Sequence, residues 1–546
     1  MPWREMSFHM SNDTSPSDRR ISVGQLLRSQ AAQYPDRTLL AFEDEAFSYG
    51  FVDSQTDRIA KGFYELGVRA GEHVAVMLPN CPDFVFCWLA LAKLGAVTVG
   101  IDIEQVGQRL RHLLQKSDAT TLVVDQALAA VIVEINEIPP MLRRLIPVGD
   151  GDQAFGHGIK EHLSVTPYRE LPTPGHLEPL LIDVLEPLML IFTSGTTGPP
   201  KAVEISHGYG LHMASEYVLH LQYTEADVLY TPYPWFHAEA PLCSFLPALL
   251  VGGKVAMSRR FSASRFWTDI RKHGATAFDF IGGVLPILFK QPPRPDDADN
   301  PVRVVAGGPW PPMASDFERR FGLKLIELYG VTECCVAAWD PLTGTHRPGA
   351  CGQVCEHHEV KIFDDHDCEL SPGEIGEIVV RPKESAGHMT KYYGDPEATV
   401  ASWRNLWYHS GDLGFLDDEG WLHFASRKKE AIRRRGTNIS AYEIEQVVSS
   451  HPAILEAVAI GVPSELTDEE IKVVAVRRPG ADCSPIELVE FAAAQLPRFM
   501  VPRYVEFVDA FPVGTTHKVN RRMLQEFWNT TSTFDGDAGI FLGAQE

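Results

Sequence analysis

Segments with the patterns of α-helices and β-strands alternate through the first part of the chain, and this alternation restricts the folds open to it. The predicted elements are a helix at Val23–Tyr34, a strand at Thr38–Phe42, a helix at Tyr49–Leu66, a strand at Glu72–Leu78, a helix at Asp83–Leu94 and a strand at Ala96–Gly100. Such alternation is typical of a parallel sheet whose strands are joined by crossover helices.

A second stretch of the same kind predicts another α/β layer within the same large domain. Its strand-like and helix-like segments are Val228–Tyr230, Phe245–Leu250, Lys254–Met257, Phe266–His273, Ala277–Ile281 and Val302–Ala306. After about Gly352 the pattern changes to short β-prone runs separated by Gly, Pro and Asp, which indicates a small β-rich subdomain. We therefore expect an α/β fold in which residues 21–426 form a large N-terminal domain of two α/β-layered subdomains and one β-rich subdomain.

The C-terminal part of the chain predicts a separate, smaller domain. A charged segment begins at Arg427, and a compact α+β pattern follows it, so residues 427–530 are expected to form a mobile α+β domain joined by a polar hinge. The polar residues 1–20 are expected to be a disordered lead-in. Residues 531–546 are expected to be a loose tail.

Composition excludes several classes of function. The chain has 546 residues and 45% hydrophobic residues, enough for substantial cores. Its 72 acidic and 49 basic residues give a net charge of −23, which disfavours a nucleic-acid partner. No uninterrupted apolar run reaches the ~18 residues of a membrane span. The nine cysteines are scattered and no signal core opens the chain, so a cytoplasmic location is expected.

One short segment contains side chains of the types that bind metals. Cys351 and Cys355 are followed by His357 and His358. No second ligand pair recurs at zinc-finger spacing, so the sequence does not predict a metal there.

The most informative segment is an apolar strand that runs into a loop crowded with hydroxyl groups and glycines. The loop contains Thr193, Ser194, Gly195, Thr196, Thr197, Gly198, Pro199, Pro200 and Lys201. Its backbone N–H groups, hydroxyls and single ammonium group suit a polyphosphate. It is not a Walker loop, because Lys201 does not directly follow a glycine.

This loop resembles the phosphate-binding loop of the adenylate-forming superfamily, which groups acyl-CoA synthetases, peptide-synthetase adenylation domains and firefly-type luciferases. Further motifs match in the same order along nearly the whole chain. They are Tyr329-Gly330-Val331-Thr332-Glu333, Trp407–Gly414, the junction that opens with Arg427, and Phe511–Asn520. The resemblance implies the large domain and mobile C-terminal domain of that superfamily.

The resemblance also implies roles for individual residues. Tyr329 and Gly330 would lie by the adenine, Thr332 would contact the α-phosphate, and Glu333 would hold Mg²⁺. Asp412 would bind the ribose hydroxyls, which suits a carboxylate that accepts two vicinal donors. Arg427 would bind the ribose and phosphate side, and Gly307 and Gly308 would contact the nucleotide. Lys429 would be the hinge, and Arg433 and Gly436 would belong to the face used in the thioester step. Lys518 would be the catalytic lysine, although His517 precedes it where most relatives have Gly.

The acyl site is expected to draw on Trp235, His237, Phe280, Gly282 and Pro309. In Phe236-His237, the histidine stands where amino-acid-activating domains usually have an Asp, so a free amino acid is not the expected substrate. The segment from Phe236 to Pro293 is most similar to crotonobetaine/carnitine-type CoA ligases.

The resemblance implies an AMP-forming acid–thiol ligase. Such an enzyme activates a carboxylic acid as an acyl-adenylate, releases pyrophosphate, and passes the acyl group to coenzyme A, using ATP and Mg²⁺. Two alternatives stay open: an adenylating enzyme that loads the phosphopantetheine of a carrier protein, and a catalytically degenerate nucleotide-binding sensor or scaffold. The identity of the acid also stays open. So does the oligomeric state, for which a homodimer is one option.

Overall fold

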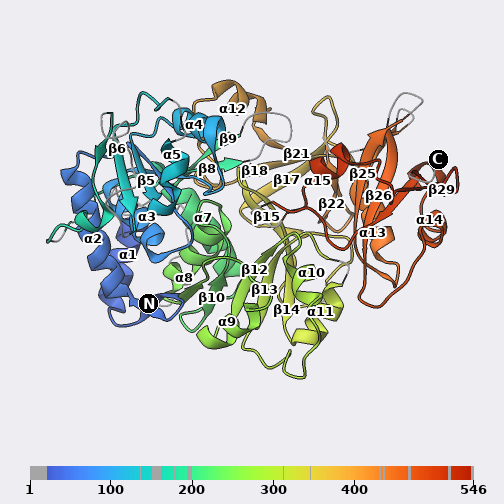
Figure 1. The fold of residues 1–546 in the computed structure, drawn as a ribbon, viewed down its shortest axis with the longest axis horizontal. Helices are drawn as coiled ribbons and strands as arrows, with labels where there is room; N and C mark the ends of the chain where they lie inside the picture. Colours follow the sequence, from blue (N-terminus) through green and yellow to red (C-terminus); the bar gives the residue numbers. More distant parts are fainter. Residues whose placement is uncertain are drawn as a thin grey trace.

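The described part of the protein consists of a large N-terminal body and a smaller C-terminal part at one end (Figure 1). The computed structural model describes residues 21–133, 135, 137–149, 162–175, 177, 180–193, 200–311, 313–344, 346–428, 432–434, 437–464, 469–514 and 518–542. The predicted α/β fold with a large and a small domain is confirmed. None of the helices in these ranges is long and apolar enough to cross a membrane.

The first α/β layer is an eight-stranded sheet that is mainly parallel. In spatial order its strands are β19 (Lys391–Tyr392), β9 (Lys201–Ser206), β8 (Pro187–Thr193), β4 (Val97–Gly100), β3 (His73–Met77), β5 (Thr121–Asp125), β6 (Arg144–Val148) and β7 (Ser164–Val165). Side chains alternate across β3: Val74 and Val76 belong to one apolar core, and Ala75 and Met77 belong to another. Both faces of the sheet are therefore buried, which explains why its strands are continuously apolar.

The second sheet has fourteen strands and passes through most of the large domain. Its order is β17 (His358–Phe363), β18 (Gly376–Pro382), β21 (Trp407–Leu416), β22 (Trp421–Arg427), β16 (Gly352–Val354), β15 (Cys335–Trp339), β14 (Lys324–Val331), β13 (Val304–Gly308), β12 (Ala277–Ile281), β10 (Val228–Thr231), β11 (Lys254–Met257), β1 (Thr38–Phe42) and β2 (Glu45–Ser48), with β20 (Trp403–Arg404) paired to β21. The strands from β14 to β1 are parallel to their neighbours, whereas those from β15 to β17 pair antiparallel.

Two features of this sheet differ from the sequence-based interpretation. The predicted strand at Thr38–Phe42 exists, but it pairs with β11 of the second sheet and does not join the first layer. The β-rich strands do not form a sheet of their own, because β15 pairs directly with the last parallel strand, β14. A strand's own residues determine its propensity but not its distant partner, which is set by packing of the whole domain.

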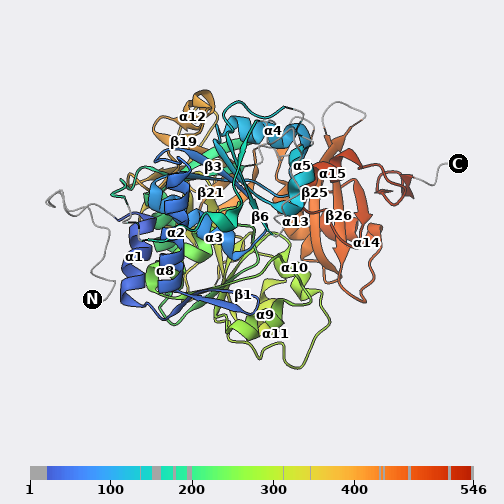
Figure 2. The same ribbon diagram turned by 60° about the vertical axis from the view of Figure 1, so that its left-hand side comes forward.

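Helices cover the sheets and join their strands, as Figures 1 and 2 show. In the large domain they are α1 (Val23–Gln33), α2 (Tyr49–Glu65), α3 (Pro82–Leu94), α4 (Gly107–Lys116), α5 (Ala129–Val133), α7 (His207–Leu221), α8 (Leu246–Val251), α9 (Phe266–His273), α10 (Val284–Phe289), α11 (Ala314–Phe321) and α12 (Pro396–Ser402). Helix α3 is buried almost along its whole length, which fits its unbroken run of apolar residues. The hydroxyl of Ser206 caps α7 by accepting a hydrogen bond from the N–H of Tyr209 at 3.1 Å.

The C-terminal part has a five-stranded sheet and a separate hairpin. Its elements are β23 (Ile432–Arg434), β24 (Thr437–Ile439), α13 (Ala441–Ser449), β25 (Ile454–Pro463), β26 (Glu469–Arg477), α14 (Pro485–Ala493), β27 (Tyr504–Phe507), α15 (Arg521–Glu526), β28 (Phe534–Asp535) and β29 (Ile540–Phe541). Strands β28 and β29 lie within the segment for which we expected a loose tail, and they extend the sheet. An ion pair of 2.9 Å between Arg503 and Asp535, together with the buried Thr533, holds this segment in place.

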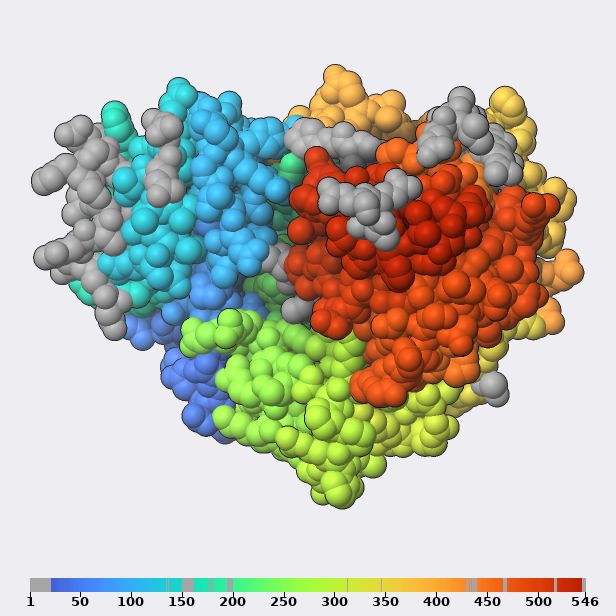
Figure 3. Space-filling view, turned by 45° about the vertical axis from the view of Figure 1, so that its right-hand side comes forward, coloured from blue at the N-terminus to red at the C-terminus, as the bar shows by residue number. Residues whose placement is uncertain are grey.

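The C-terminal part lies against the large domain (Figure 3). Polar contacts cross the junction: Arg478 lies 3.7 Å from the carboxylate of Asp316, and the ammonium of Lys290 donates to the carbonyl of Asp509 at 3.1 Å. Apolar contacts cross it as well: the rings of Phe424 and Tyr442 lie 5.5 Å apart, and Leu455 and Val458 belong to the same apolar cluster as the core of the large domain.

Candidate active site

The predicted nucleotide and acyl residues gather at the carboxyl ends of neighbouring parallel strands. Strands β12, β13 and β14 end at Ile281, Gly308 and Val331, and the register aligns Ile281 with Gly308. In open α/β sheets, ligands bind at this edge. Gly282 and Pro309 follow directly in the sequence, so strand register alone brings parts of three predicted motifs together.

Glycines allow these strand ends to approach one another closely. A Cβ atom at Gly307 would lie 2.0 Å from the carbonyl oxygen of Phe280, and one at Gly330 would lie 2.7 Å from the carbonyl oxygen of Cys335. Both distances are shorter than van der Waals contact, so a side chain at either position would force the backbone apart. Phe280, predicted for the acyl site, is buried in strand β12 beside Gly307.

Glu333 follows strand β14 and is held in place by residues from the first sheet. Its Oε1 accepts a hydrogen bond of 2.9 Å from the hydroxyl of Tyr392, and the ammonium of Lys201 lies 4.5 Å from the centre of the Tyr392 ring. Burial raises the pKa of Glu333, and Tyr392, Lys201 and Arg427 partly oppose this rise. Sequence reasoning missed Tyr392, which is brought here only because β19 pairs with β9.

Tyr209 fixes the turn that carries Thr332. Its hydroxyl donates to the carbonyl of Thr332 at 2.8 Å and accepts from the N–H of Cys335 at 2.7 Å. Cys335 has a left-handed backbone with φ of 62°, which the turn imposes. Tyr209 is fully buried in the first turn of α7, and no motif in the sequence pointed to this role.

Three residues predicted for the nucleoside form one connected group. The Tyr329 hydroxyl donates to Oδ2 of Asp412 at 2.9 Å, and Nε of Arg427 lies 3.5 Å from Oδ1 of the same carboxylate. Strands β21 and β22 place Asp412 directly opposite Arg427. Because Arg427 also lowers the pKa of Glu333, this group and the Glu333 group are neighbours.

His237 lies beside a partly buried carboxylate, Glu239, that the sequence reasoning did not identify. Its Nδ1 is in hydrogen-bond contact with Glu239, which begins a π-helical segment, Glu239–Phe245. Burial raises the pKa of Glu239, but the charges of His237 and Lys518 outweigh burial, so this pKa lies below its usual range. Lys518, from the C-terminal domain, is thus close to Glu239.

The loop that carries Lys518 is closed by backbone bonds. Val513 and Val519 form an antiparallel bridge, and the N–H of Gly514 donates to the carbonyl of Lys518 at 3.0 Å. The Lys518 side chain is exposed. An exposed ammonium on a closed loop is free to approach a ligand bound to the large domain.

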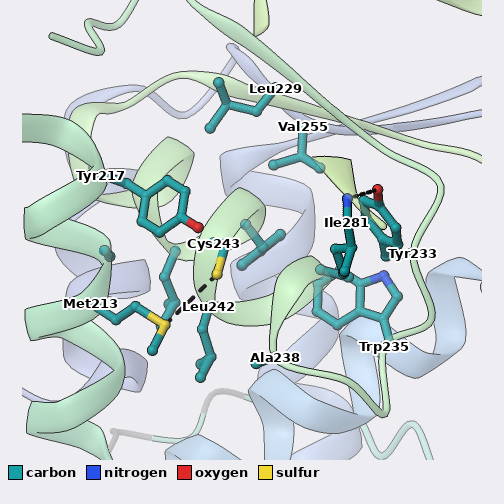
Figure 4. Packing of buried hydrophobic residues seen from close by; sticks show 14 of the residues in the cluster. Met213, Tyr217, Leu229, Tyr233, Trp235, Ala238, Leu242, Cys243, Val255 and Ile281 are labelled. Atoms are coloured by element: carbon teal, nitrogen blue, oxygen red, sulfur yellow. Dashed lines mark hydrogen bonds between the residues drawn. The ribbon is translucent and has the colours of Figure 1, made fainter. Parts of the chain in front are cut away.

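Trp235, which was predicted for the acyl site and lies near His237 in the sequence, is part of a buried aromatic cluster. Its side chain is 1% exposed, and its ring packs against Trp88 and Phe245 at centroid distances of 5.6 and 5.3 Å. The indole N–H donates to the sulfur of Met257 at 2.7 Å. Figure 4 shows Trp235 among the buried residues of this cluster, so the structure assigns it to the core.

Several predicted residues lie outside the described part of the chain. They are Ser194, Gly195, Thr196, Thr197, Gly198, Lys429 and Gly436, together with the side chain of Arg433. The strands on both sides of the predicted phosphate loop are described, and they pair Thr193 with Lys201. Both ends of this loop therefore emerge side by side, next to Glu333.

Both domains are similar to domains of known proteins. Residues 27–393 match the family described as AMP-binding enzyme, and residues 443–518 match the AMP-binding enzyme C-terminal domain. A crotonobetaine/carnitine–CoA ligase of Salmonella enteritidis PT4 (strain P125109) is 33% identical over 522 residues, which cover 92% of this chain and 100% of that protein.

Solved structures show the same fold. An anthranilate CoA ligase in complex with anthranoyl-AMP has a TM-score of 0.84 and 23% identity, covering 94% of this chain and 98% of that one. An o-succinylbenzoate coenzyme A synthetase from Bacillus subtilis, in complex with AMP, has a TM-score of 0.74 and 25% identity, covering 92% and 98%. The chain belongs to the AMP-binding enzyme family, and the resemblance to the acyl-CoA ligase branch of the adenylate-forming superfamily is confirmed.

Proposed function

We propose that the residues gathered at this site carry out both half-reactions of an ATP-dependent acyl-CoA ligase. One observation carries the proposal. Arg427 contacts Asp412, and its charge also lowers the pKa of Glu333, so one guanidinium acts on a carboxylate suited to ribose hydroxyls and on a carboxylate suited to a metal. The names of the relatives, CoA ligases and a synthetase, support the same reaction.

The nucleoside end of ATP would be held by the Tyr329, Asp412 and Arg427 group. Asp412 is an acceptor for the two ribose hydroxyls, and Tyr329 and Arg427 fix its orientation. The adenine would lie along Tyr329 and Gly330. Gly307 and Gly308, which have no side chains, would leave the backbone open to the nucleotide.

The phosphates would be bound where the loop between Thr193 and Lys201 meets Glu333. Lys201 would supply a positive charge, and Ser194 to Gly198, which lie outside the described part of the chain, would supply hydroxyl and N–H donors. Thr332 would contact the α-phosphate. The Tyr209 hydroxyl holds the Thr332 carbonyl, so the turn is rigid before the substrate arrives.

Glu333 fits the Mg²⁺ that the family implies. It is a half-buried carboxylate, and desolvation raises its pKa, so a cation beside it would stabilise its charged form. Magnesium typically takes one or two protein carboxylates, with phosphate oxygens and water as its other ligands. When bound, Mg²⁺ supplies positive charge to the triphosphate.

In the first half-reaction, a carboxylate oxygen forms a bond to the α-phosphorus of ATP, and pyrophosphate leaves. Attacker and target are both negative, so cations must offset their repulsion. Lys518 is placed for this, because it lies near Glu239 and His237, the residues beside which the carboxylic acid would bind. Gly282, Phe280 and Pro309 would complete the acyl site.

In the second half-reaction, the thiol of coenzyme A attacks the acyl carbon, and AMP leaves. The small domain would rotate about Lys429 and present Arg433 and Gly436 to the site. The polar contacts between the domains at Arg478 and Lys290 are partly exposed, so such a rotation would exchange them for contacts with water.

The direct test is a panel of carboxylic acids assayed for pyrophosphate release from ATP, with and without coenzyme A. We expect pyrophosphate only with a suitable acid and acyl-CoA only when coenzyme A is added. Holo carrier protein in place of coenzyme A tests the alternative acceptor, with products identified by mass spectrometry. ATP binding without turnover across the panel would favour the sensor or scaffold instead.

Asp412→Ala is expected to weaken ATP binding by roughly ten- to a hundredfold, because a hydrogen bond to a charged group contributes about 1.5–3 kcal/mol. Calorimetric titration with a non-hydrolysable ATP analogue measures the effect. Tyr329→Phe is the control, since it removes one hydrogen bond to Asp412 but leaves the carboxylate. Equal affinities of Asp412→Ala and wild type would remove Asp412 from the ribose site.

A further inference from the structure

Helix α7 carries a row of metal-binding side chain types on one face. His212, Glu216 and His220 are spaced four residues apart, so they lie above one another along the helix. The turn between β16 and β17 carries Cys355 and His357, and β17 begins at His358. The sequence lacked a second ligand pair at zinc-finger spacing, but helix α7 lies beside β15 and supplies one (Figure 1).

The side chains from the two segments meet around the carboxylate of Glu216. Its Oε1 lies 2.6 Å from Nδ1 of His357, and its Oε2 lies 3.3 Å from Nε2 of His220. One ligand atom each from Glu216, His220 and Cys355 all lie within 4.8 Å of one another. Tetrahedral zinc, with bonds of about 2.0–2.3 Å, places its ligand atoms roughly 3.3–3.8 Å apart, so small side-chain rotations would close the site.

The burial of this cluster makes it unlike a surface group of polar residues. Glu216 is 1% exposed and Cys355 is 3% exposed. Within the described ranges, the ion-pair partners of Glu216 are histidines, His220 and His357. A buried carboxylate beside a buried thiol and an imidazole is a ligand set of the kind that zinc takes.

We propose that Glu216, His220 and Cys355 bind a divalent zinc ion. On binding, the Cys355 thiol loses its proton to solvent, and the sulfur forms a bond to zinc. The thiolate and the carboxylate balance the two charges of the ion, and His220 binds as neutral imidazole. His357 hydrogen-bonds the other oxygen of Glu216 and orients it from outside the ligand set.

The zinc ion would clamp α7 to the strands of the β-rich part. Tyr209 lies on the same helix, seven residues before Glu216, which corresponds to about 10 Å along the axis. Since Tyr209 holds the turn of Thr332, the clamp would stabilise the frame of the active site without contacting its substrates. Three protein ligands leave the fourth tetrahedral position of zinc to a water molecule, and this ion is separate from any Mg²⁺ at Glu333.

The full-length chain is first stripped of metal with a chelator and then dialysed against Zn²⁺. It is expected to retain about one tightly bound zinc ion per chain, measured by inductively coupled plasma mass spectrometry. Loading with Co²⁺ should give a thiolate-to-cobalt charge-transfer band in the near ultraviolet. Zinc should also raise the midpoint of thermal unfolding.

Cys355→Ser should lose the thiolate band and most of the bound metal, and His220→Ala should weaken metal retention. Cys351→Ser is the matched control, because it removes another buried thiol from the same region and should keep both signals. The proposal is overturned if the wild-type chain retains no metal, if its cobalt complex lacks the thiolate band, or if Cys355→Ser and Cys351→Ser behave alike. The cobalt spectrum of the wild-type chain can refute the proposal by itself, so the test does not depend on whether a variant folds.

Discussion

Replacing Lys518 with alanine is expected to slow acyl-adenylate formation by roughly a hundredfold or more, as for loss of a major electrostatic contact in a transition state. Thioester formation from preformed acyl-adenylate should be largely unchanged. The reason is positional, because Lys518 lies near Glu239 in the arrangement observed here and would leave with the small domain in the second step. Rapid-quench measurement of each half-reaction separates the two effects.

Lys290→Ala is the control for this variant. Lys290 is a lysine of the large domain that contacts the small domain through the Asp509 carbonyl, so its loss tests domain docking alone. We expect only a small effect on adenylation. If Lys518→Ala slowed both half-reactions equally, either the domains do not alternate or another residue supplies the cation.

The Glu333→Gln variant is expected to lose adenylation activity by about two orders of magnitude or more at ordinary Mg²⁺ concentrations, while ATP binding persists. The amide can still accept the hydrogen bond from Tyr392, so the local fold should survive. Only the negative charge is removed. Single-turnover rates measured across a Mg²⁺ titration should show a higher Mg²⁺ requirement.

Tyr392→Phe is the matched control for Glu333→Gln, because it removes the hydrogen bond and leaves the carboxylate. It should keep the wild-type Mg²⁺ requirement with a modest loss of rate. An unchanged Mg²⁺ dependence in Glu333→Gln would show that Glu333 does not hold the metal.

Much of the local structure could be predicted from the sequence, but the distant pairings could not. The strand at Thr38–Phe42 was predicted correctly, yet its partner β11 lies more than two hundred residues away and is chosen by packing. The same holds for Tyr392, which reaches Glu333 only through the pairing of β19 with β9. Nothing in the residues around Tyr392 marks it as part of a site.

The predicted site residues differ in how they were identified: some belong to motifs, and others do not. Tyr329, Asp412 and Arg427 belong to ordered motifs, and the structure joins them by contacts of 2.9 and 3.5 Å. Trp235 was predicted for the acyl site together with His237, and that role stays a prediction. Its large apolar ring favours the core, where it packs against other aromatic rings.

The metal-binding residue types show the same limit. Cys355 and its two histidines were visible in the sequence, but their partners on α7 precede them by more than a hundred residues. A search for ligand residues at fixed spacing within one short segment cannot find a metal site whose ligands come from two distant segments. The helical spacing of His212, Glu216 and His220 was the signal that could have suggested a second half.

The pairing of β14 with β15 affects how the protein unfolds. Cutting the fold between its parallel and antiparallel parts would expose two long unpaired edges, so these parts should melt as one cooperative unit. Among the described strands, those of the C-terminal sheet pair only with one another. Calorimetric heating should therefore resolve at most two transitions, not one for each of the three subdomains and one for the small domain.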